Sequence, residues 1–114
     1  MDFGALREEV WWANTQLPAN RLVVMHSGNA SGVDRQTGLV LIKPSGVDYN
    51  VLKPEDIVLV SLETGETLPG QKYRSSSDTP THVCLYQRLD MLGGIVHTHS
   101  PKATSWAQAC RAIP

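Results

Sequence analysis

The stretch that decides the fold of this chain runs from residue 93 to residue 101 and is Gly93-Gly94-Ile95-Val96-His97-Thr98-His99-Ser100-Pro101. The two glycines end the segment before it, and the adjacent Ile95 and Val96 are residue types enriched in strands. We therefore predict a strand over residues 95–99. Because proline suits the first turn of a helix, we predict a helix over residues 101–108 directly after it.

His97 and His99 are the sharpest chemical feature of the sequence. Residues two apart in a strand point to the same face and lie about 7 Å apart, so their imidazoles can converge on one metal ion. Asp78 begins a predicted helix and could complete a His₂-carboxylate site, the set found in catalytic zinc sites with an open position. The alternatives are two solvated histidines at a polar strand end and an ordinary N-cap aspartate.

Working outward, the chain alternates between helical and extended patterns. The expected helices cover residues 3–17, closed by Pro18, and 79–92, and the expected strands cover residues 22–25, 39–43 and 57–61. The first helix has an apolar face with steps of three and four, formed by Phe3, Leu6, Val10, Ala13 and Leu17. Residues 26–38 are rich in Ser, Gly, Asn and Asp and are expected to form a loop. Alternating helices and strands in 114 residues predict one α/β or α+β domain.

Three polar loops have compositions that suit anion binding. They are Gly28-Asn29-Ala30-Ser31-Gly32, Lys43-Pro44-Ser45-Gly46 and Ser75-Ser76-Ser77-Asp78. Glycine lets the backbone approach a ligand closely, and a helix N-terminus offers free N–H groups to a phosphate. Lys43 shares a strand face with two leucines, so its charge points inward and needs a partner such as an anionic ligand. Taken singly, each loop is also explained by ordinary turn chemistry.

The composition excludes several classes of protein. With 10 Lys and Arg against 11 Asp and Glu, the net charge of −1 argues against nucleic-acid binding. No apolar run approaches the roughly 20 residues of a membrane helix. Cys84 and Cys110 fit neither a metal motif nor a disulfide framework, so we expect a reducing, cytoplasmic setting. His26 and His82 are interpreted as structural histidines.

Four motifs, in this order, resemble those of the class II aldolase/epimerase family. They are Ser27-Gly28-Asn29-Ala30-Ser31, Ile42-Lys43-Pro44-Ser45-Gly46-Val47, Ser76-Ser77-Asp78-Thr79-Pro80-Thr81-His82 and Gly93-Gly94-Ile95-Val96-His97-Thr98-His99-Ser100. The resemblance extends from Val10 to the end of the chain. It implies a layered α/β/α fold with a central, mostly antiparallel sheet flanked by helices. Residues 1–114 would form a single class II aldolase/adducin-like domain that is truncated at its C-terminus.

The resemblance also implies a set of site residues. The phosphate-binding positions of the family match Gly28, Asn29, Ser45, Gly46, Ser76 and Ser77, and its metal ligands match Asp78, His97 and His99. The implied cofactor is one divalent metal, zinc or alternatively manganese. Lys43 is a candidate for stabilising anionic oxygen or phosphate. The resemblance further implies that a third metal-binding histidine and the acid/base residues of the family would lie beyond the end of this chain.

Aspartate at position 78 is typical of the epimerases in the family, whereas the aldolases typically have glutamate there. The resemblance therefore implies a metal-dependent epimerase that cleaves and re-forms a carbon–carbon bond of a phosphorylated ketopentose, and a homotetramer. A class II sugar-phosphate aldolase or related dehydratase is one alternative, and a non-catalytic adducin-like interaction module is another. Residues 1–114 alone are expected to be inactive and to associate through the exposed edge of strand 95–99.

Overall fold

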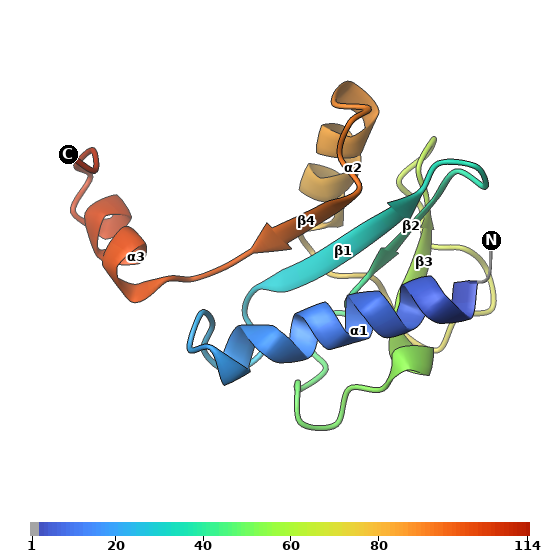
Figure 1. The fold of residues 1–114 in the computed structure, drawn as a ribbon, viewed down its shortest axis with the longest axis horizontal. Coiled ribbons are helices and arrows are strands. Elements are labelled where there is room, and N and C mark those ends of the chain that lie inside the picture. The colour runs from blue at the N-terminus through green and yellow to red at the C-terminus, as the bar shows by residue number, and fades with distance from the viewer. Residues whose placement is uncertain (1–2) are drawn as a thin grey trace.

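The structure, a computed structural model, describes residues 3–114. Its elements are α1 (Phe3–Ala19), β1 (Asn29–Asp34), β2 (Leu39–Ile42), the short 3-10 helix η1 (Pro54–Asp56), β3 (Val58–Ser61), α2 (Thr79–Arg88), β4 (Gly94–His97) and α3 (Pro101–Gln108). The strands form one antiparallel sheet in the order β3-β2-β1-β4. Helix α1 lies across one face of the sheet and α2 lies behind the other (Figure 1). The expected layered α/β/α fold is confirmed.

Strand β2 shows why the sheet is covered on both faces. Val40 and Ile42 belong to a buried cluster with Val83 of α2, whereas Leu41 belongs to a second cluster with Val10 of α1. Successive residues of a strand face opposite sides, so a strand that is buried on both sides is a continuous apolar run. The predicted strand over residues 39–43 is therefore confirmed, with Lys43 one residue past its end.

Strand β1 lies within residues 26–38, where the sequence predicted a loop, and that prediction is wrong. Polar groups of its backbone and side chains can be buried because both helices supply hydrogen-bond partners. The Ser31 hydroxyl lies 2.7 Å from Nδ1 of His82 on α2. The side chain of Asn14 on α1 donates to the carbonyl of Ala30 at 3.0 Å and accepts from the N–H of Ala30 at 2.8 Å. These partners are distant in sequence, so local composition did not reveal the strand.

Two other predicted elements differ from the structure. Residues 22–25 form no strand, and the backbone at Met25 is left-handed with a φ of 57°, which turns the chain there. The helix predicted over 79–92 ends at Arg88 because the guanidinium of Arg35 binds three carbonyls near and beyond the end of that helix, at 3.0–3.2 Å. Helix α1 continues through Pro18 to Ala19, so the prediction that Pro18 closes it is wrong. The remaining predicted elements are present with end shifts of at most two residues.

The edge of the sheet formed by β4 connects to α3, which extends away from the sheet (Figure 1). No residue of α3 is buried. Strand β4 is the last strand in the order of the sheet, in keeping with the edge position predicted for it, and its Val96 is 57% exposed. Over residues 3–114, none of the helices combines the length and the apolar character needed to cross a membrane.

Candidate functional site

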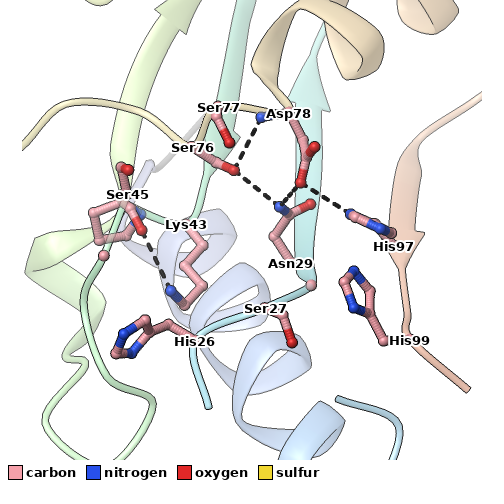
Figure 2. Close-up of a pocket in the computed structure, with 13 residues that line it drawn as sticks. His26, Ser27, Asn29, Lys43, Ser45, Ser76, Ser77, Asp78, His97 and His99 are labelled. Carbon is pink, nitrogen blue, oxygen red and sulfur yellow. Dashed lines mark hydrogen bonds and ion pairs between the residues drawn. The ribbon is translucent and has the colours of Figure 1, made fainter. Parts of the chain in front are cut away.

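A cavity of about 280 Å³ lies where the start of β1, the end of β2, the start of α2 and the end of β4 come together (Figure 2). Its volume is just below the range of about 300–1,000 Å³ that is usual for small-molecule sites, which suits a small ligand. The cavity is lined by all ten site residues expected from the sequence: Gly28, Asn29, Lys43, Ser45, Gly46, Ser76, Ser77, Asp78, His97 and His99. His26, Ser27 and Pro44 complete the lining.

Asn29 is at the centre of this arrangement. As the first residue of β1 it pairs with His97, the last residue of β4, in the antiparallel register. Its amide nitrogen donates to the Ser76 hydroxyl at 2.9 Å and to Oδ2 of Asp78 at 2.8 Å. Its amide oxygen is buried and has no hydrogen-bond partner within the described part of the chain. A buried acceptor of this kind is costly unless a ligand or water donates to it.

The Asp78 carboxylate faces the cavity. Asp78 occupies the N-cap position of α2, but its side chain makes no capping hydrogen bond, so its interpretation as an ordinary N-cap is wrong. Its Oδ2 atom lies 2.9 Å from Nδ1 of His97. Partial burial acts to raise the pKa of the Asp78 carboxyl, but the hydrogen bonds from Asn29 and His97 outweigh it. The net pKa lies below its usual value, and Asp78 is an anion at neutral pH.

His99 lies beyond the end of β4, where its backbone N–H donates to the backbone carbonyl of Leu22 at 2.8 Å. Its ring centroid is 4.9 Å from that of His97, and both rings line the cavity (Figure 2). Two imidazoles and a carboxylate are a donor set that suits a divalent metal such as zinc. However, no three His, Cys, Asp or Glu side chains within residues 3–114 are arranged to share one ion. Asp78 and His97 are bonded to each other, and a metal would have to replace that bond.

Lys43 lies on the opposite side of the cavity from His97 and His99 (Figure 2). It is only 2% exposed, which agrees with the inward orientation expected from the strand period. Its ammonium donates to the carbonyl of Pro44 at 3.3 Å and lies 4.7 Å from the ring centroid of Tyr49. Burial lowers the pKa of Lys43, and the nearby charge of Asp48 only partly opposes this. No carboxylate among the described residues forms an ion pair with Lys43.

The two serine loops are tied to each other. The backbone N–H groups of Ser45 and Ser76 donate to carbonyls of the facing loop at 2.9 and 3.1 Å. These two N–H groups are therefore not available to a ligand. In the described structure, the backbone N–H groups of Gly46 and Ser77 make no hydrogen bond, so both are available to an anion.

Two residues of this region were misjudged or missed from the sequence. His26 was interpreted as structural, but it is exposed and lines the cavity beside Lys43 (Figure 2). Tyr49 was not singled out, because no local pattern marks a residue that contacts two distant loops. His82 is 2% exposed, and burial lowers its pKa, so its interpretation as a structural histidine agrees with the structure.

Comparison with known proteins decides the family. Residues 8–114 match the model of the class II aldolase and adducin N-terminal domain. The chain belongs to the class II aldolase and adducin family. The resemblance inferred from the four motifs is thereby confirmed, and the match includes every residue of the cavity.

Two relatives within this family are L-ribulose-5-phosphate 4-epimerases UlaF, from Salmonella paratyphi B and Salmonella typhi. Each is 53% identical to this chain over 109 residues, which cover 96% of this chain and 47% of the relative. The chain thus spans about half the length of these curated relatives. Among solved structures, an L-fuculose 1-phosphate aldolase matches with a TM-score of 0.85 and 29% identity, over 94% of this chain and 50% of the aldolase. The corresponding aldolase of Thermus thermophilus matches with a TM-score of 0.71 and 27% identity, over 90% and 50% of the two chains.

Proposed function

We propose that the protein containing this chain is an L-ribulose-5-phosphate 4-epimerase, which interconverts L-ribulose 5-phosphate and D-xylulose 5-phosphate. The observation that carries the proposal is that one small cavity combines a cation, Lys43, and two serine loops with the carboxylate–imidazole cluster of Asp78 and His97. The 53% identity to proteins named as such epimerases supports this choice within the family. Within this proposal the protein is cytoplasmic and forms a homotetramer.

The cavity provides separate places for the two ends of the substrate. The phosphate group would be bound by Lys43 and by the free N–H groups of Gly46 and Ser77, since charge-assisted and backbone hydrogen bonds are strong for anions. Ser45 and Ser76 also line the cavity, and the Ser76 hydroxyl accepts a hydrogen bond from the Asn29 amide. The sugar chain would then extend toward Asn29, whose free amide oxygen can accept a hydrogen bond from a substrate hydroxyl.

Asp78, His97 and His99 would hold a divalent cation, which we propose to be zinc, once the hydrogen bond between Asp78 and His97 is replaced by bonds to the metal. When bound, such an ion supplies Lewis-acid stabilisation of the negative charge that develops as a carbon–carbon bond beside a carbonyl breaks. Asn29 fixes the Asp78 carboxylate through its hydrogen bond of 2.8 Å, so the carboxylate is oriented before any ligand binds. The phosphate-binding side retains the phosphorylated aldehyde, which can turn its other face before the bond re-forms.

A class II sugar-phosphate aldolase is the second candidate, favoured by the solved structures that match this fold. The two candidate functions are distinguished by incubating the native protein with L-ribulose 5-phosphate and zinc and then analysing the products. We expect D-xylulose 5-phosphate to accumulate without net release of glycolaldehyde phosphate and dihydroxyacetone. Net release of those two fragments would instead assign an aldolase.

Replacing Lys43 with methionine tests the phosphate site. Loss of a charge-assisted hydrogen bond should weaken the affinity for inorganic phosphate about 10- to 100-fold. The same substitution should raise the thermal unfolding midpoint, because it removes a buried cation that has no ion-pair partner among the described residues. Isothermal titration with phosphate and thermal unfolding measure the two effects. An unchanged phosphate affinity would show that Lys43 does not bind the anion.

The lowered pKa of Lys43 also predicts how phosphate binding depends on pH. Because burial depresses this pKa below its ordinary value of 10.5, Lys43 should lose its proton, and phosphate affinity should fall, before an exposed lysine would titrate. The Lys43→Arg variant stays protonated throughout this range and should hold its affinity to higher pH. Titrations between about pH 7 and pH 10 compare the two proteins. Parallel pH profiles would contradict this assignment.

A further inference from the structure

We infer that Tyr49 is a positioning residue for the phosphate side of the cavity, which it organises without lining the cavity itself. The inference rests on the proposed function, because it assumes that an anion binds beside Lys43. Tyr49 follows the Lys43-Pro44-Ser45-Gly46 loop and is 6% exposed, in a small core cluster with Leu17 and Val23. It is not among the residues that line the cavity.

The hydroxyl of Tyr49 holds the turn that leads into β1. It lies 2.9 Å from the carbonyl oxygen of Ser27 and 2.8 Å from that of Gly28. Burial raises the pKa of Tyr49 to about 12, so the hydroxyl keeps its proton and acts as the donor at neutral pH. Asn29 directly follows this turn, and the position of its amide in the cavity therefore depends on where the turn is held.

The aromatic ring of Tyr49 contacts the side-chain ammonium of Lys43 on the phosphate side of the cavity. The ammonium of Lys43 lies 4.7 Å from the ring centroid, within the range of a cation–π contact. The same ammonium donates a hydrogen bond of 3.3 Å to the Pro44 carbonyl. Because the ring supports a buried charge without neutralising it, Lys43 remains available to an anion.

One side chain thus connects two parts of the cavity that are distant along the chain. The turn at Gly28 leads into β1 and Lys43 follows β2, and Tyr49 contacts both through different groups, its hydroxyl and its ring. The two contacts can therefore be removed separately. Tyr49→Phe removes the hydrogen bonds and keeps the ring, whereas Tyr49→Leu removes both.

The experiment measures the affinity for inorganic phosphate and the steady-state kinetics of the native protein with L-ribulose 5-phosphate. We expect Tyr49→Phe to weaken phosphate binding about 3- to 10-fold and Tyr49→Leu to weaken it about 10- to 100-fold. Both variants should raise KM by more than they lower kcat, because the residue orders the phosphate side rather than the reacting bond. Tyr49→Phe should bind phosphate more tightly than Tyr49→Leu, and the difference in affinity measures the contribution of the ring.

Tyr73→Phe is the matched control. The ammonium of Lys72 lies 4.6 Å from the ring centroid of Tyr73, in a similar cation–π contact, but neither residue lines the cavity. This control variant should leave phosphate affinity unchanged. If the parent binds phosphate and Tyr49→Phe, folded by circular dichroism, binds it equally well, the role of Tyr49 is overturned while the proposed function stands. If the parent itself does not bind phosphate, the proposed phosphate site and this inference both fail. The phenylalanine variant decides the outcome even if the leucine variant does not fold.

Discussion

Replacing His97 with alanine should lower kcat/KM of the proposed epimerase about 10²–10³-fold, the loss typical of removing a group that stabilises developing charge. The same variant should lose bound divalent metal, measured by elemental analysis after gel filtration. Its fold should persist, because the His97 side chain is 38% exposed and its polar partner, Asp78, is 39% exposed and can be solvated. Thermal unfolding within a few degrees of the parent would confirm that the effect is local.

His26→Ala provides the control for this prediction. His26 lines the same cavity, but it lies beside Lys43, away from the Asp78 cluster (Figure 2). The variant should therefore retain its metal. If His97→Ala keeps both its metal and its activity, the assignment of the carboxylate–imidazole cluster as the reactive centre is wrong.

Replacing Gly28 with alanine should destabilise the protein by about 2–4 kcal/mol, the sum of a left-handed backbone and overpacking. Gly28 has a φ of 75°. A Cβ atom at this position would lie 2.8 Å from the carbonyl oxygen of His97 and would overlap the side chain of Val23. Relief of these contacts would shift the turn before Asn29, so phosphate affinity should fall as well. Chemical denaturation followed by circular dichroism measures the change in the free energy of unfolding.

Gly46→Ala is the matched variant for Gly28. Its φ of 69° is similar, but a Cβ atom there would meet nothing within 4 Å. The cost should therefore be only the backbone strain of about 1 kcal/mol. Equal losses in the two variants would show that packing around Gly28 contributes nothing.

The sequence by itself determined most of the elements and the composition of the site. The apolar residues of β2 and β3, the proline at the start of α2 and the proline at the start of α3 are local signals, and each is confirmed by the structure. The four motifs identified the family, which the family match then confirmed. They also named ten residues that prove to line one cavity. Such signals are readable because strand period, helix capping and turn chemistry act over a few neighbouring residues.

Only the tertiary structure decided the features that depend on distant partners. The polar sequence of β1 forms a buried strand because Asn14, His82 and Tyr86 satisfy its polar groups from the two helices. The carboxylate of Asp78 turns from a capping position into the cavity because Asn29 and His97 bind it there. The burial of a polar group is favourable only when its hydrogen bonds are replaced, and the replacing groups here lie 16 to 55 residues away.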